Sequence, residues 1–128
     1  MSAPDVSLLL DIDREYREKA ASGVLQKIAP RRFNPVKEAW LPVLHSRFGP
    51  WRFTALYSNT DLAHNLRRTR DWVVICFDDD ERDDGQATVV TEWRGELEGR
   101  RVVRGREREC AVHYRALARL ASEELAAP

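Results

Sequence analysis

The continuous apolar run at residues 72–77 most constrains what this chain can fold into. Its sequence, WVVICF, consists of aromatic and β-branched residues around a single cysteine. Runs of this length and composition are typical of a strand that is covered on both faces. We therefore predict that residues 72–77 form a strand in the middle of a sheet.

Four further segments have the composition of strands and are joined in pairs by short turns. Residues 38–46 and 51–58 flank the sequence RFGP, and residues 86–94 and 100–104 flank the sequence GELEG. Connections this short join antiparallel strands. In the second segment, alternation predicts that one face is made of Trp51, Phe53, Ala55 and Tyr57.

Helices are predicted near both ends of the chain and before the central strand. Residues 5–21 carry apolar side chains every three or four positions and are followed by Gly23, a typical helix stop. Three residues that can cap a helix, at 59–61, precede a short apolar stretch at 62–66. From Glu107 onward, one apolar stripe predicts a closing helix.

The segment at residues 24–36 contains two prolines and separates the first helix from the first hairpin. Prolines at this spacing favour an irregular conformation over a helix or a strand. We expect the segment to cross the surface, anchored by Leu25, Ile28 and Phe33.

The order of these elements predicts an α+β domain, with a mostly antiparallel sheet of about five strands and with helices packed on one face. A chain of 128 residues has the usual length of one domain, and no linker or repeat divides it, so we expect a single domain over residues 1–128. No apolar run of about 18 residues occurs, and charged residues interrupt positions 1–21. We therefore expect a cytoplasmic protein without a membrane partner.

Sequence signatures of cofactor enzymes are absent. The chain has no P-loop, no GxGxxG and no GxSxG sequence, so no cofactor is expected. Cys76 and Cys110 lie outside any CxxC pattern, and we expect both to be small buried apolar residues that bind no metal.

The acid-rich stretch at 78–85 does not match a calcium loop, because Arg82 and Thr91 fall where ligands are needed. A solvated turn is the simpler interpretation.

A small metal-dependent nuclease or hydrolase is one functional alternative. Such a site needs two or three carboxylates beside a histidine or lysine, and Mg²⁺ would be its metal. The candidate catalytic residues are His45, Asp71, Glu92 and Glu107, which lie on or beside predicted strands and helix starts. None of them stands at a diagnostic spacing, so structural or surface roles explain them more simply.

Arginine dominates the basic residues. The formal net charge is zero, but 18 of the 21 basic residues are arginine, and they cluster at 31–32, 67–70 and 100–108. Arginine suits bidentate phosphate binding, although a GC-rich coding bias would produce the same excess. In the third cluster a predicted strand enters a helix start, whose free N–H groups favour a phosphate. An exposed edge strand kept soluble by charge is the alternative.

Aromatic residues interleave with arginine in the first predicted hairpin and could stack on single-stranded bases. A domain of this size needs most of its aromatic side chains for the core, which is the competing explanation. The residues concerned are Trp40, Phe48, Trp51 and Phe53.

Several segments are similar to a known bacterial family. The sequences LLDIDREYR at 9–17, IAPRRFNP at 28–35, AWLPVLH at 39–45, TALYSNT at 54–60, DWVVI at 71–75 and GRRVVRGRE at 99–107 resemble the C-terminal module of helix-hairpin-helix proteins related to polymerase X. The resemblance covers roughly residues 5–115. It implies a role near DNA, but no polymerase or phosphoesterase activity, because the residues of those neighbouring domains are missing. The matching positions form a candidate shared polar site of His45, Asn59, Thr60, Asp71, Arg101, Arg104 and Glu107.

The first functional hypothesis is therefore an accessory domain that binds the phosphates of DNA or RNA. Its candidate binding residues are Arg31, Arg32, Arg67, Arg68, Arg101 and Arg104. The nuclease is one alternative, and a non-catalytic module that binds a protein partner or a second copy of itself is another. The choice depends on whether the arginine clusters, which are far apart in sequence, meet in space.

Overall fold

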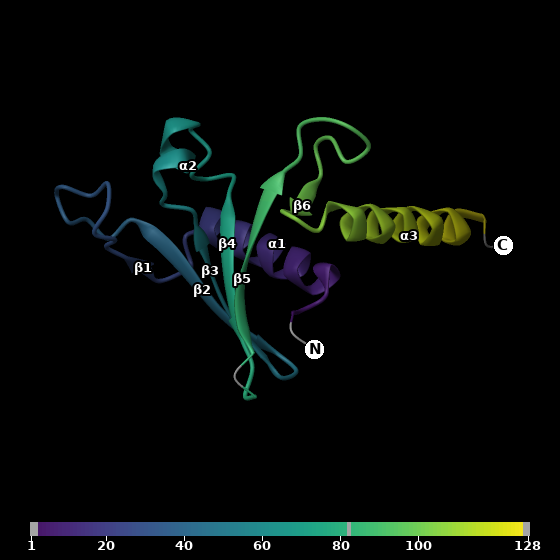
Figure 1. Ribbon diagram of the computed structural model, residues 1–128, viewed down its shortest axis with the longest axis horizontal. Coiled ribbons are helices and arrows are strands. Elements are labelled where there is room, and N and C mark those ends of the chain that lie inside the picture. The colour runs from purple at the N-terminus through teal and green to yellow at the C-terminus, as the bar shows by residue number, and fades with distance from the viewer. Residues whose placement is uncertain (1–2, 82, 127–128) are drawn as a thin grey trace.

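The computed structural model describes residues 3–81 and 83–126 and shows a six-stranded antiparallel sheet with three helices (Figure 1). The strands follow one another in the sheet in the same order as in the chain, and each pairs antiparallel with the next. Along the chain the elements are α1 (Val6–Ser22), β1 (Lys27–Ile28), β2 (Leu41–Phe48), β3 (Trp51–Tyr57), α2 (Asp61–Asn65), β4 (Val73–Asp78), β5 (Asp84–Thr91), β6 (Arg101–Val103) and α3 (Glu107–Ala126).

The predicted α+β class and antiparallel sheet are confirmed, with one strand more than expected. The additional strand is β1, in which Lys27 and Ile28 pair with Pro42 and Leu41. Two residues are too few to show the alternation by which a strand is recognised in a sequence. The three predicted helices are all present.

Helix α1 covers one face of the sheet and supplies much of the core. It packs against β2, β3, β4, β5 and β6, and its buried apolar side chains are Val6, Leu9, Leu10, Ile12 and Tyr16. The helix ends at Gly23, whose φ of 76° lies in the left-handed region that favours glycine. The three-to-four spacing read from the sequence is therefore the spacing of the buried stripe.

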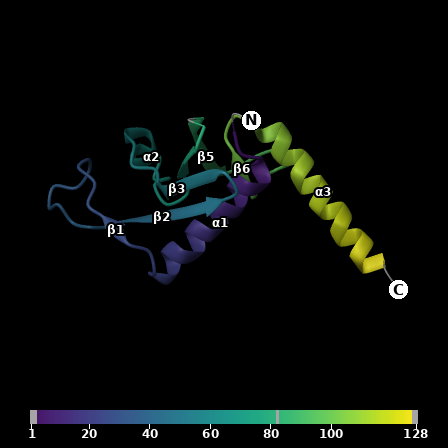
Figure 2. The ribbon, with the colours of Figure 1, turned by 90° about the horizontal axis from the view of Figure 1, so that it is seen from below.

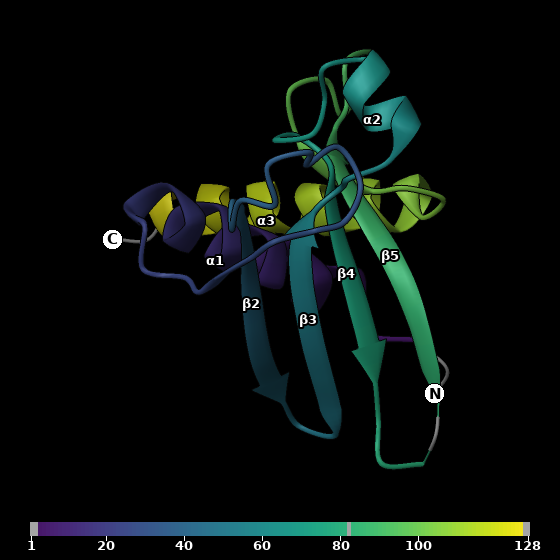
Figure 3. The ribbon, with the colours of Figure 1, turned by 90° about the vertical axis from the view of Figure 1, so that its left-hand side faces the viewer.

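Helix α3 lies on the same side of the sheet and contacts α1 and β6 (Figures 2 and 3). The two long helices meet near their beginnings and then diverge, so α3 projects beyond the sheet. All side chains from residue 115 to residue 126 are exposed. The short helix α2 lies at one end of the sheet instead of on its face. Within the described residues, no helix is both long enough and apolar enough to cross a membrane.

In the part of the chain that the structure describes, no helix packs on the face of the sheet opposite α1, and this corrects one prediction. In β4 the buried residues Val73, Ile75 and Phe77 alternate with the half-buried Val74 and the exposed Cys76. The prediction that the run WVVICF is covered on both faces was therefore wrong, and so was the burial expected for Cys76. Cys110 is buried as predicted, and its sulfur accepts a hydrogen bond from the Val103 N–H at 3.3 Å.

The connections between the strands lie at two opposite ends of the sheet. Residues 29–40, 58–72 and 92–100 lie at one end, which we call the loop end, together with α2. The tight turns of the β2–β3 and β4–β5 hairpins lie at the other end, which we call the hairpin end. This separation follows from the topology, since each strand of an antiparallel meander reverses the direction of the one before it.

Tyr16 ties α1 to the sheet by hydrogen bonds inside the core. Its hydroxyl donates to the Pro42 carbonyl at 2.7 Å and accepts from the Tyr57 N–H at 2.9 Å. The side chain is fully buried, and this burial raises the pKa of Tyr16 well above its usual value. The hydroxyl thus remains neutral and satisfies two backbone groups that have no access to water.

Replacing Tyr16 with phenylalanine should destabilise the domain by about 1–3 kcal/mol, because a buried N–H and a buried carbonyl both lose their partner. Urea unfolding followed by tryptophan fluorescence measures this change in the free energy of unfolding. The matched control is Tyr57→Phe, since the Tyr57 hydroxyl makes no hydrogen bond within the described part of the chain. Equal effects of the two substitutions would contradict the role given to Tyr16.

Candidate nucleic-acid interface

The loop at residues 30–38 is closed around the side chain of Asn34. The Asn34 amide donates to the Pro30 carbonyl at 3.0 Å and to the Glu38 carbonyl at 2.8 Å, and its oxygen accepts from the Glu38 N–H at 3.0 Å. Asn34 itself is only 8% exposed. The loop is irregular, as its prolines predict, but its two ends are held together by three hydrogen bonds to one side chain.

This loop docks on α2, which lies about 30 residues further along the chain. The Asn59 amide donates to the Arg32 carbonyl at 3.1 Å, and the Arg32 guanidinium pairs with Asp61 at 3.1 Å. The rings of Phe33 and His64 stack, with centroids 4.0 Å apart and planes inclined by 28°. His64 Nε2 lies 2.6 Å from Asn59 Oδ1. Two of the arginine clusters found in the sequence therefore belong to neighbouring segments.

Two of the expected anchors of this segment are not buried. Ile28 is 44% exposed and Phe33 is 46% exposed, while Leu25 is half-buried against the core. The prediction that Ile28 and Phe33 hold the segment down was wrong. Asn34 performs that role through hydrogen bonds, which apolar patterning does not reveal.

Thr60 and Asn59, the two polar positions singled out before α2, have structural contacts. Thr60 caps the helix, since its hydroxyl accepts from the Ala63 N–H at 3.1 Å and lies 3.2 Å from the Ser58 hydroxyl. Asn59 bridges His64 and the Arg32 carbonyl, as described above. The structure thus brings Asn59 and Thr60 to the loop end beside Arg32 and uses them to join the loop to the helix.

Arginines without a carboxylate partner are concentrated at the loop end. Nine of the arginines that the structure describes form ion pairs. Within residues 3–81 and 83–126, eight others have no carboxylate within ion-pair distance. Two of these eight, Arg108 and Arg119, are on α3. The remaining six belong to the three segments of the loop end and are Arg31, Arg67, Arg68, Arg70, Arg94 and Arg100.

The hairpin end has the opposite charge. Its acid-rich stretch at 78–84 contains six acidic residues and one basic residue, whereas the three segments of the loop end together contain eight basic and six acidic residues. Asp78 and Asp80 pair with Arg52 and Arg47. Asp79 accepts from the backbone N–H groups of Glu81 and Asp83 and so shapes the turn. Although the net charge of the chain is zero, acidic residues are therefore concentrated at the hairpin end, and basic residues outnumber acidic ones at the loop end.

Arg101, a predicted phosphate ligand, is instead the centre of a buried network. Its guanidinium donates twice to Asp13, at 2.8 and 3.1 Å, and once each to Asp71, Thr91 and the Val89 carbonyl, at 3.0, 3.0 and 3.1 Å. These five bonds use all five N–H donors of an arginine side chain. Asp13 is completely buried and also accepts from Arg17 at 3.0 Å. We therefore assign Arg101 to holding the fold, since no donor is left over for a phosphate.

Arg104 is exposed but lies between two carboxylates. Its guanidinium is 2.9 Å from Glu107 and 3.5 Å from Glu92. The neighbouring Arg106 pairs with Glu109 at 2.7 Å and donates to the Pro4 carbonyl at 2.7 Å. At the junction between β6 and α3, carboxylates thus already occupy the positions where a phosphate was expected.

The four candidate catalytic residues fall into separate places. Asp71 accepts from the Thr91 N–H and hydroxyl, at 3.1 and 2.7 Å, in addition to Arg101, while Glu92 and Glu107 share Arg104. His45 is on β2, on the face opposite α1, 3.3 Å from the Thr54 hydroxyl. Thr54 pairs with Cys76 on β4, and five residue steps separate Cys76 from Asp71, or on the order of 15 Å along a strand. Among the described residues, no group of three or more His, Cys, Asp or Glu side chains is placed to hold a metal ion.

The aromatic residues of the first hairpin are mainly part of the core. Trp51 and Phe53 are buried, and Trp40 is half-buried against the core, so only Phe48, at 64% exposed, is available at the surface. The loop end has two exposed aromatic residues, Phe33 and Trp93, that the sequence did not reveal as surface aromatics. Trp93 is 69% exposed, and the Arg94 guanidinium lies over its ring. An aromatic residue between prolines, outside any alternating pattern, was the available signal for Phe33.

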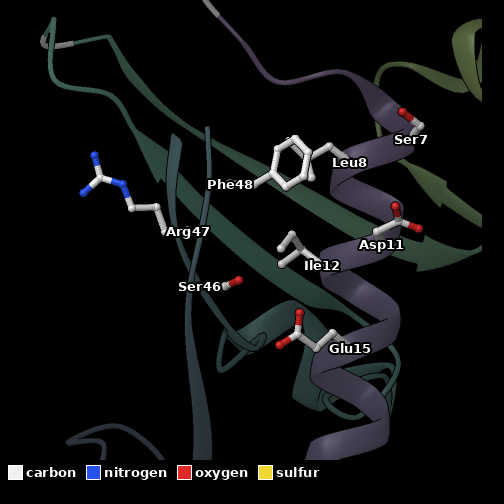
Figure 4. A pocket seen from close by; sticks show the side chains of 8 residues that line it. All are labelled: Ser7, Leu8, Asp11, Ile12, Glu15, Ser46, Arg47 and Phe48. Carbon is white, nitrogen blue, oxygen red and sulfur yellow. The ribbon is translucent and has the colours of Figure 1, made fainter. Parts of the chain in front are cut away.

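A shallow hollow between α1 and β2 is less suited to a phosphate (Figure 4). The carboxylates of Asp11 and Glu15 lie on its helical wall, and Phe48 lies beside it. Arg47 points away from the helix and pairs with Asp80. Negative charge thus lines this hollow, in contrast to the loop end.

Comparison with known proteins reveals no relative: no family model, no curated protein and no solved structure matches the chain. The assignment of a site therefore rests on the residues and their geometry.

Replacing Arg101 with lysine should destabilise the domain by about 2–5 kcal/mol, because lysine cannot supply five donors in a plane and would leave the buried Asp13 carboxylate short of partners. The control is Arg104→Lys, an exposed ion-paired position where we expect less than about 1 kcal/mol. Urea unfolding of both variants measures the difference. If the two variants unfold at the same urea concentration as the parent, Arg101 does not hold the fold.

Proposed function

We propose that the loop end binds nucleic acid through its phosphates, with Arg31, Arg67 and Arg68 as the principal contacts and Arg32 beside them. The observation that carries this proposal is the docking of the loop at residues 30–38 on α2, which gathers arginines from two distant parts of the sequence. The same function was expected from the segments that resemble helix-hairpin-helix proteins related to polymerase X.

The electrostatics of the loop end favour a polyanion. The charge of a guanidinium without a carboxylate partner is uncompensated and its donors are available to a phosphate, whereas an ion-paired arginine must first give up its partner. Arg31, Arg67 and Arg68 are all exposed. The acidic hairpin end would be repelled by the same phosphates, so the charge separation orients the domain with its loop end toward the ligand.

A metal-dependent nuclease remains the alternative enzyme activity. It would require His45, Asp71, Glu92 and Glu107 to act together with Mg²⁺, although other residues engage three of these side chains and His45 is remote from them. Incubation of labelled strands with the protein and Mg²⁺ tests this alternative directly, because a nuclease shortens the strands and a binding domain does not.

A protein-interaction role is favoured by a separate observation on α3. Leu117, Leu120 and Leu125 are 49%, 58% and 89% exposed on the part of the helix that projects beyond the sheet. Exposed apolar side chains on one helix are typical of a surface that binds another protein or a second copy. The molar mass in solution, measured by light scattering across a concentration series, distinguishes a dimer from a monomer.

Replacing Arg67 and Arg68 together with alanine should weaken the binding of labelled oligonucleotides by about tenfold or more at low salt. It should also reduce the slope of log K against log salt by about one for each phosphate that the variant no longer neutralises. Fluorescence anisotropy over a salt series measures both quantities. The matched control is the pair Arg108→Ala and Arg119→Ala, which removes two unpaired arginines from α3.

The control variant should bind as the parent protein does. An equal loss in the two double variants would show that general charge, and not the loop end, determines binding. Absence of binding by the parent protein at high micromolar concentration would contradict the proposed function altogether.

A further inference from the structure

Phe33 has an unusual position at the loop end. Its ring is 46% exposed, although a large aromatic side chain normally contributes most when it is buried. Its φ of 54° lies in the left-handed region, which is unfavourable for a bulky residue. Neither feature is explained by packing, because Phe33 is not part of the buried core.

Backbone strain is concentrated around the same place. Within the described residues, the non-glycine residues with positive φ are Phe33, Lys37 and Arg67, at 54°, 55° and 55°. Phe33 and Lys37 belong to the loop closed by Asn34, and Arg67 follows α2, on which that loop docks. Strained backbone of this kind persists only where the surrounding contacts maintain it, and it is concentrated at functional sites.

The contacts of Phe33 fix its ring before any ligand arrives. The Asn34 side chain closes the loop on either side of it, and His64 stacks on the ring at 4.0 Å. His64 is itself held by Asn59. The Arg32 guanidinium lies 5.5 Å from the centroid of the same ring. The result is an aromatic platform in the same loop as Arg31, stacked on the helix that leads to Arg67 and Arg68.

From this arrangement we infer that the loop end binds single-stranded nucleic acid, with one unpaired base stacked on the Phe33 platform and the flanking phosphates on the unpaired arginines. Stacking of bases on exposed aromatic rings, combined with basic side chains that contact the phosphates, is how proteins bind single strands without reading their sequence. Bases in a duplex present only their edges, so this platform is useful only for an unpaired base. The inference rests on the proposed function and specifies its ligand class.

A base on this platform would add to the stack that His64 and Phe33 already form. The Arg32 guanidinium, which lies over the Phe33 ring, would either contact the bound base or turn to a phosphate. It can do so because both side chains of its ion pair with Asp61 are exposed. An exposed ion pair contributes little stability and is readily exchanged. Arg32 can therefore leave the Phe33 ring by a movement of its side chain alone.

The test compares three labelled ligands of equal length: a mixed single strand of DNA, its duplex, and an abasic strand that keeps the sugar-phosphate backbone without bases. The parent protein should bind the mixed single strand most tightly. Phe33→Leu should weaken binding to that strand by about tenfold, the effect expected when one base–aromatic stack is removed. The same variant should leave binding to the duplex and to the abasic strand unchanged.

The matched control is Phe48→Leu, which removes an exposed aromatic ring at the hairpin end and should bind all three ligands as the parent does. Phe33→Trp is a control for a structural effect of substitution in the loop. Tryptophan keeps a stacking surface, so this variant should retain the preference for the single strand. The inference is overturned if Phe33→Leu binds the mixed single strand as tightly as the parent, or if Phe33→Trp loses as much affinity as Phe33→Leu.

The outcomes also separate this inference from the function on which it rests. If the Arg67 and Arg68 substitutions weaken binding to every ligand but Phe33→Leu changes none, phosphate binding stands and the base platform does not. If the parent protein binds none of the three ligands, both are wrong.

Discussion

The guanidinium of Arg101 is the interaction on which the rest of the structure depends. From β6 it reaches Asp13 on α1, Asp71 before β4, and Thr91 and Val89 on β5. It thereby joins α1 to the sheet, and it joins β6 to β5 and to the segment that leads into β4. A buried charge imposes this order because leaving any of its donors or acceptors unpaired costs more than the pairing contributes.

The loop end is built on this fixed frame. Asp71, held by Arg101 and Thr91, follows Arg67, Arg68 and Arg70 in the chain, so the network anchors the segment that carries these arginines. On the other side, Asn34 closes the loop that presents Phe33. Arg101 inside the frame is paired with two carboxylates, whereas Arg67, Arg68 and Arg70 outside it have none within ion-pair distance in the described part of the chain. The difference between Arg101 and these three arginines is thus one of partners.

The fold was largely predictable from the sequence, because it depends on periodic patterns. The stripe of α1 and the alternation of β3 read directly as buried faces, and short polar turns indicated the antiparallel pairing. The exposure of Cys76 could not be read from the run WVVICF, since a continuous apolar run does not tell whether a helix covers the second face. The two residues of β1 pair through their backbone and leave no pattern.

The site was less predictable, because it depends on contacts between distant residues. Arg67 and Arg101 look alike in the sequence, but Asp13 lies 88 residues from Arg101 and neutralises it. The meeting of Arg32 with Asp61 and Asn59 was equally invisible, since nothing in either segment specifies the other. Phe33 was predicted to anchor its surface segment on hydrophobicity alone, whereas its position is set by the hydrogen bonds of Asn34 next to it.

The strict correspondence between strand order and chain order has an evolutionary consequence. Since every connection at the loop end returns to the neighbouring strand, a change in the length of one loop leaves the pairing register of all strands intact. The hairpin end is insulated from such changes by the full length of the strands. Selection can therefore reshape the ligand-facing loops of this domain by insertion and deletion while the strand pairing and the Arg101 network continue to specify the fold.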